Sequence, residues 1–159
     1  MPDQKNVFIS HVHEDDDLIK PLKELIGRAG MEVRNGSITR DKFNDAQNED
    51  YIKSKILSPR IQWASTLVVL ITHDTATSDW VNWEVKCAVE QGKNVIGVFA
   101  QGATDADVPE ELGKCGDALI VGWQGDRVVD AISGRITDWD DPEGRPRDPE
   151  WRIRRYSCA

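Results

Sequence analysis

The feature of the sequence that most constrains the fold is a regular alternation of short apolar runs with helical patterns. Apolar runs predict five strands, at residues 6–10, 31–34, 65–72, 94–99 and 118–121. Helical spacing predicts helices at residues 18–29, around 51–57 (ending at Pro59 or soon after), at 79–91, from 109 and over 128–132. Strands that alternate with helices form parallel βαβ units. We therefore expect an α/β fold: a doubly wound five-stranded parallel sheet, order 2-1-3-4-5, with helices on both faces.

Length, cysteine spacing and charge narrow the class of protein. A chain of 159 residues suits one domain, and Cys87, Cys115 and Cys158 are spaced too widely for a disulfide framework or a zinc site. The first ten residues lack the apolar segment of a secretory signal, and the longest apolar run, 67–71, is too short to span a bilayer. The net charge of −8 argues against nucleic acid as the main partner. We expect a soluble, cytoplasmic protein that binds neither membranes nor nucleic acids.

The predicted topology also indicates where a ligand would bind. In doubly wound sheets, ligands bind beyond the carboxyl ends of the strands, where the strand order reverses. In this chain that position lies between residues 10–14, after the first strand, and residues 72–79, after the third. A long polar connection, residues 35–48, follows the second strand, and connections of this length are often functional.

One charged residue breaks the pattern of the helix that begins near Asp79. On a helical wheel, Val81, Val85 and Val89 lie on the apolar side, and Glu84 falls on the margin of that side. A buried carboxylate has to be paired, protonated or placed in a cleft. Two explanations account for this position equally well: a structural role, in which a nearby lysine or backbone donors hold the carboxylate, and a functional role. The location beside the predicted ligand site makes Glu84 a candidate catalytic residue.

Two segments carry a resemblance to a known family. NVFISHVHED, residues 6–15, resembles the first box of Toll/interleukin-1 receptor (TIR) domains. SDWVNWE, residues 78–84, resembles the Ser-x-Trp-x-x-x-Glu segment whose glutamate is catalytic in the enzymatic members. The segments GSITRDKFND, YIKSKI and GKNVIGVF are similar to a prokaryotic TIR-like group that includes the TIR component of the Thoeris antiphage system. We divide the chain into a TIR-like domain, 1–136, and a C-terminal extension, 137–159, that either packs on the surface or is a tail.

The resemblance implies a flavodoxin-like sheet and an activity. Enzymatic members cleave the nicotinamide–ribose bond of NAD⁺, which is a substrate, so neither cofactor nor metal is expected. Thoeris-like members cyclise the ADP-ribose into a signal that activates a separate effector protein. Related enzymes often complete their sites by self-association, and a phage-derived trigger is a further expected partner.

The resemblance also suggests a role for each candidate site residue. Glu84 would stabilise the positive charge of the transition state. Trp80 would stack on a base, while Ser10 and His11, at the end of the first strand, would contact phosphates or ribose. The connection 35–48 matches the family's BB loop; its candidate substrate-binding residues are Ser37, Phe43 and Asp45.

Other interpretations remain open at this point. A TIR module that only assembles with other proteins is the main rival. The His11-Val12-His13-Glu14-Asp15 run has the H-x-H-x-D pattern of binuclear metallohydrolases, but only His73 remains to complete such a site. A phosphoacceptor receiver domain is a third alternative, but this chain lacks the lysine that such a domain needs after the fifth strand. Neither a G-x-G-x-x-G loop nor a Walker-type loop is present, which disfavours dehydrogenase and NTPase chemistry.

Overall fold

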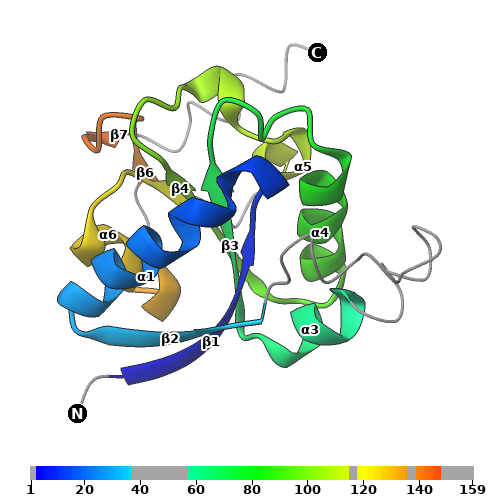
Figure 1. The fold of residues 1–159 in the computed structure, drawn as a ribbon, viewed down its shortest axis with the longest axis horizontal. Coiled ribbons are helices and arrows are strands. Elements are labelled where there is room, and N and C mark those ends of the chain that lie inside the picture. The colour runs from blue at the N-terminus through cyan, green and yellow to red at the C-terminus, as the bar shows by residue number, and fades with distance from the viewer. Residues whose placement is uncertain (1–2, 37–56, 115–117, 136–138, 148–159) are drawn as a thin grey trace.

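The computed structural model describes residues 3–36, 57–114, 118–135 and 139–147, and a parallel sheet forms its centre (Figure 1). The five strands run in the order β2-β1-β3-β4-β5, all parallel, which confirms the predicted fold class. Their bounds are β1 (Asp3–Ser10), β2 (Met31–Asn35), β3 (Thr66–Ile71), β4 (Asn94–Phe99) and β5 (Leu119–Val121).

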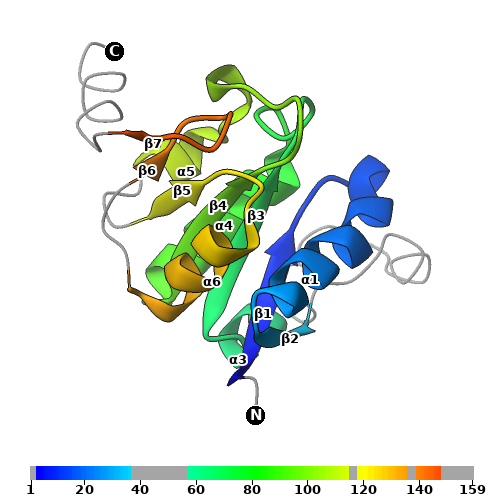
Figure 2. The same ribbon diagram turned by 90° about the vertical axis from the view of Figure 1, so that its left-hand side faces the viewer.

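Helices cover both faces of this sheet (Figures 1 and 2). One face carries α1 (Ile19–Arg28) and α6 (Gly125–Ser133), and the other carries α3 (Ser58–Trp63), α4 (Asp79–Glu90) and α5 (Glu110–Lys114). None of the helices in the described ranges is long and apolar enough to cross a membrane.

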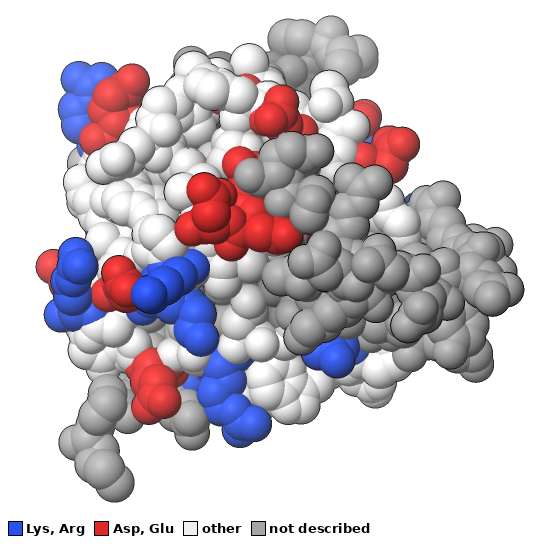
Figure 3. Space-filling model, viewed as in Figure 1, with Lys and Arg blue, Asp and Glu red and all other residues white. Residues whose placement is uncertain are grey.

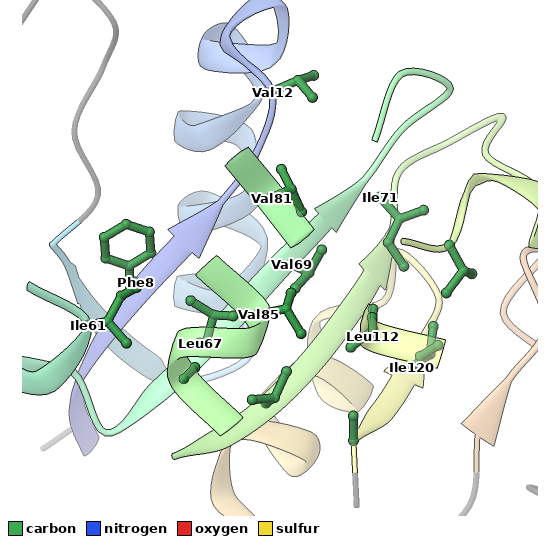
Figure 4. Packing of buried hydrophobic residues seen from close by; sticks show 14 of the residues in the cluster. Phe8, Val12, Ile61, Leu67, Val69, Ile71, Val81, Val85, Leu112 and Ile120 are labelled. Carbon is green, nitrogen blue, oxygen red and sulfur yellow. The ribbon is translucent and has the colours of Figure 1, made fainter. Parts of the chain in front are cut away.

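Successive residues of each strand enter different cores, because side chains alternate between the two faces of a sheet. Val7 and Ile9 of β1 pack with α1 and α6, whereas Phe8 packs with α3 and α4. Figure 4 shows Val81 and Val85 of α4 directed onto the sheet. Burial on both faces explains why the strands appear in the sequence as continuous apolar runs.

The helix that carries Glu84 begins and ends where the sequence predicts. The Ser78 hydroxyl oxygen accepts a hydrogen bond of 3.2 Å from the Val81 N–H, which satisfies one of the free donors of the first turn of α4. The helix ends at Glu90, and Gly92 follows with a φ of 71°, a conformation that glycine adopts without strain.

The region around Pro59 differs from the expectation. Pro59 was expected at or near the end of a helix, but it lies in the first turn of α3, which continues to Trp63. Proline is tolerated there because the N–H groups of the first turn have no partner within the helix. Residues 51–56, the rest of the predicted helix, lie outside the described ranges.

The first part of the C-terminal extension packs against the end of β5. A short antiparallel pair, β6 (Trp139–Asp140) with β7 (Pro146–Arg147), brings the fully buried Asp140 to the loop that follows β5. Its carboxylate accepts a hydrogen bond from the Gly122 N–H at 3.0 Å and pairs with the Arg127 guanidinium at 2.9 Å. Residues 148–159 lie outside the described ranges.

Candidate active site

The candidate site lies where β1 and β3 end side by side. The last residue of β1, Ser10, is paired with Val69 of β3. The chain turns after β3 through residues 73–77 and returns along the sheet as α4. Glu84 therefore faces the carboxyl end of β1 from the helix that follows β3, at the point where the strand order reverses.

A buried hydrogen bond joins the two elements. The Ser10 hydroxyl donates to Oε1 of Glu84 at 2.8 Å, across 74 residues of sequence. Ser10 is fully buried and Glu84 is only 7 % exposed. Burial raises the pKa of Glu84 to about 8, although the hydrogen bond from Ser10 acts in the opposite direction. The carboxyl group is therefore mainly protonated at neutral pH before any ligand binds.

We expect the buried carboxyl group of Glu84 to make the protein less stable as the pH rises. Between the ordinary pKa of 4.5 and the folded value of about 8, the native state keeps a proton that the unfolded state has lost. The stabilisation is complete below the lower value, is lost at about 1.4 kcal/mol per pH unit between the two values, and is gone once the pH has risen above the folded value. Thermal unfolding of wild type and Glu84→Gln across this range should show the variant gaining relative stability as the pH rises. A stability difference that does not change with pH would contradict the prediction.

Two further networks hold the segment that follows β1. The buried ring of His11 contacts the Ile9 carbonyl oxygen through Nδ1 at 3.0 Å and Oδ1 of Asp16 through Nε2 at 2.5 Å. Since both ring nitrogens have partners within the chain, His11 anchors η1 (His13–Leu18) to β1. This short 3₁₀ helix leads directly into α1. The predicted contact between His11 and a ligand stays a prediction.

The second network joins η1 to the end of β3. The Thr72 hydroxyl donates to Oδ2 of Asp15, and burial and the charges of Asp74 and Asp17 raise the pKa of Asp15. Figure 3 shows acidic side chains gathered over η1. The segments after β1, β3 and β4, residues 11–17, 72–79 and 100–109, contain no lysine or arginine. This rim of the site therefore favours cationic groups over phosphates.

The other predicted site residues have different outcomes. Trp80 is partly buried and packs against the core formed by α3, α4 and β3. Ser37, Phe43 and Asp45 lie outside the described residues, so their predicted roles stay predictions. The placement of Val89 on the apolar side of α4 is wrong, since Val89 is 45 % exposed and the buried Glu84 occupies the inward face instead.

The structure adds a pair of residues that the sequence analysis did not bring together. Nδ1 of His73, two residues beyond β3, lies 3.0 Å from Oδ2 of Asp107, beyond β4. From the sequence alone, His73 is a candidate only for a metal site. The pair could have been found from the predicted strand order, because the two residues follow strands that lie side by side in the sheet.

One solved structure has a similar fold, and a second is a more distant match. A solved structure of a conserved protein from Enterococcus faecalis V583 is similar, with 13 % identity, a TM-score of 0.50, and coverage of 84 % of this chain and 99 % of that one. A 3-dehydroquinate dehydratase-like protein from Bifidobacterium longum has 12 % identity, a TM-score of 0.44, and coverage of 84 % and 97 %. The first likeness concerns the fold alone, and the second is too distant to support any argument. No curated protein matches the chain.

The doubly wound sheet with a buried glutamate beside the end of β1 is the arrangement that the resemblance to TIR-like domains led us to expect. The model of the family "Thoeris protein ThsB, TIR-like domain" matches residues 8–105, more than half of the chain. The chain belongs to this family of the Thoeris antiphage defence system, and the resemblance seen in the sequence is confirmed at that level.

Proposed function

We propose that this domain cleaves the bond between nicotinamide and ribose in NAD⁺, which is its substrate, with no cofactor. The observation that carries the proposal is the buried Glu84, hydrogen-bonded to Ser10 where the strand order reverses. Doubly wound sheets generally bind their ligands at this position, beyond the carboxyl ends of the strands, which supports the same location. Membership of the Thoeris TIR-like family is compatible with NAD⁺ processing.

The chemistry of the bond suits a buried carboxylate. In NAD⁺ the nicotinamide ring is a pyridinium cation, and it becomes a neutral molecule when the bond to ribose breaks. Its departure therefore requires no proton donor. The ribose becomes oxocarbenium-like in the transition state, and a carboxylate stabilises that positive charge strongly where water is excluded. The pyridinium cation of NAD⁺ favours the ionised form of Glu84, so binding of NAD⁺ would release the proton that Glu84 holds in the free protein.

The remaining candidate residues would complete the substrate site. Trp80 offers an aromatic surface for stacking, one turn before Glu84 on α4. Ser37, Phe43 and Asp45 would close over the dinucleotide from the connection between β2 and α3. Ser10 acts mainly on Glu84, by holding its carboxyl group in place.

The product would serve as a signal. We propose that the ADP-ribosyl group is cyclised and activates a separate effector protein, after a phage-derived trigger and self-association have completed the site. NAD⁺ is abundant in the cytoplasm, which is where we propose that the protein acts.

The proposal is tested by incubating concentrated protein with NAD⁺ and identifying the products by liquid chromatography with mass spectrometry. We expect nicotinamide together with a product of the mass of ADP-ribose or of its cyclic form, and a kcat/KM that rises with pH towards the pKa of about 8 of free Glu84. NADH is the matched control, because its dihydronicotinamide is not a cationic leaving group. If no nicotinamide is released, even with lysate from phage-infected cells, the domain is an assembly module and not an enzyme.

A further inference from the structure

The pair formed by His73 and Asp107 lies at the same edge of the sheet as Glu84. His73 begins the turn that leads from β3 into α4, and Asp107 is the last residue of η4 (Asp105–Asp107), after β4. β3 and β4 are neighbours in the sheet, so the two connections meet, and the Nδ1–Oδ2 distance is 3.0 Å. Thr75 braces the turn through its hydroxyl, which accepts a hydrogen bond of 2.7 Å from the Thr72 N–H.

The surroundings of Asp107 determine which nitrogen of His73 is free. Oδ2 of Asp107 also accepts hydrogen bonds from the N–H of Thr104 at 2.8 Å and from its hydroxyl at 3.2 Å. A carboxylate in this role is an acceptor, so Nδ1 of His73 carries the hydrogen, and in the neutral ring Nε2 has the free electron pair.

Nε2 of His73 is also accessible. The His73 side chain is 70 % exposed, while the carboxylate that orients it is only 11 % exposed. The position that a Cβ of residue 102 would occupy lies 3.9 Å from Nε2, but the residue is Gly102, with a φ of 88°. The ring is therefore held through Nδ1, and most of the side chain is exposed to solvent.

The chemistry of the proposed reaction requires a group of this kind. Departure of nicotinamide consumes no proton, but the oxygen nucleophile that replaces it, a water or a ribose hydroxyl, must lose one. The segments 11–17, 72–79 and 100–109 contain no lysine or arginine, and both nitrogens of His11 are engaged. Besides His11 and His73, the titratable side chains described in these segments are carboxylates, and His73 is the exposed imidazole. The described residues contain no group of three or more side chains that could hold a metal ion.

We propose that His73, oriented by Asp107, accepts the proton of the oxygen nucleophile, an inference that rests on the proposed cleavage of NAD⁺. The bond between the ribose carbon and nicotinamide breaks, and its electron pair stays on nicotinamide. An oxygen electron pair forms the new bond to the same carbon, and the proton passes to Nε2 and then to solvent. Glu84 stabilises the developing cation, His73 completes the transfer, and Asp107 is a positioning residue.

The experiment compares two nucleophiles in His73→Gln. Water and ribose hydroxyls lose a proton on attack, whereas the ring nitrogen of added 3-acetylpyridine attacks with no proton to lose. We expect the variant to form ADP-ribose and its cyclic product about a hundredfold more slowly, a typical loss for a general base. It should still exchange nicotinamide for 3-acetylpyridine at nearly the wild-type rate, with an unchanged KM for NAD⁺. Glu84→Gln should lose both reactions.

Asp107→Asn should show the same selective loss in weaker form, since asparagine keeps an acceptor for the Thr104 N–H. Gln101→Ala, exposed in the adjacent loop, is the matched control and should retain both reactions. Equal loss of both reactions in His73→Gln, a raised KM, or retention of both overturns the role of His73. If wild-type protein catalyses neither reaction, the proposed function itself fails.

Discussion

Replacement of Glu84 by glutamine is expected to lower the rate of nicotinamide release at least about a hundredfold, because the loss of one preorganised electrostatic group has an effect of this size. Glutamine has nearly the same shape and can still accept the Ser10 hydrogen bond, so the fold is retained. It carries no negative charge to oppose the developing oxocarbenium ion. The measurement is the initial rate of nicotinamide release at saturating NAD⁺.

Glu90→Gln is the matched control for this prediction. It lies on the same helix, is exposed, and should leave the rate unchanged. Although Glu84→Gln should lower the rate, it should raise the stability, because it removes a buried ionisable group. In mildly alkaline buffer the variant should unfold at a higher temperature than wild type. Unchanged turnover in Glu84→Gln would mean that the charge of Glu84 is not used in the reaction.

The second large effect is expected at Asp140. Asp140→Ala removes the acceptor of the Gly122 N–H and the partner of Arg127 together. Breaking a buried ion pair by removing one partner typically costs about 3–5 kcal/mol. We expect a loss of that order in the free energy of unfolding, measured by urea denaturation of the full chain.

Two companion variants sharpen this test. Glu143→Ala, in the same hairpin, removes a carboxylate whose side chain is 68 % exposed and should change stability by less than about 0.5 kcal/mol. Asp140→Asn keeps an acceptor for Gly122 but loses the charge, so its effect should lie between the other two. Similar stability of all three variants and wild type would show that the hairpin contributes nothing to the folded domain.

The sequence predicted the elements that depend on local physics. The strands are apolar on both faces because parallel strands are covered on both sides, and this signal survives in one sequence without any partner. Ser78 and Gly92 mark the ends of α4 through capping and backbone freedom, which are properties of the residues themselves. Pro59 was misjudged because proline both ends helices and begins them, and only the surrounding chain distinguishes the two.

The candidate site was predicted in part. The position of Glu84 on the margin of an apolar helix face was visible, because a charge in an apolar pattern needs an explanation. Its burial was not visible, since the helical wheel placed Val89 on the inward face, whereas Val89 is exposed. The bond from Ser10 to Glu84 and the pair of His73 with Asp107 join residues far apart in the chain.

By itself, the sequence determined the class of fold, the strand order and the edge of the sheet where a ligand would bind, because periodicity, caps and connection lengths are local and the handedness of βαβ units is general. Only the tertiary structure decided the state of the groups at that edge. The protonation of Glu84, the free nitrogen of His73 and the buried Asp140 each depend on which polar atoms replace water around a side chain. Those atoms come from segments that folding brings together, so their identity is not present in any single stretch of the chain.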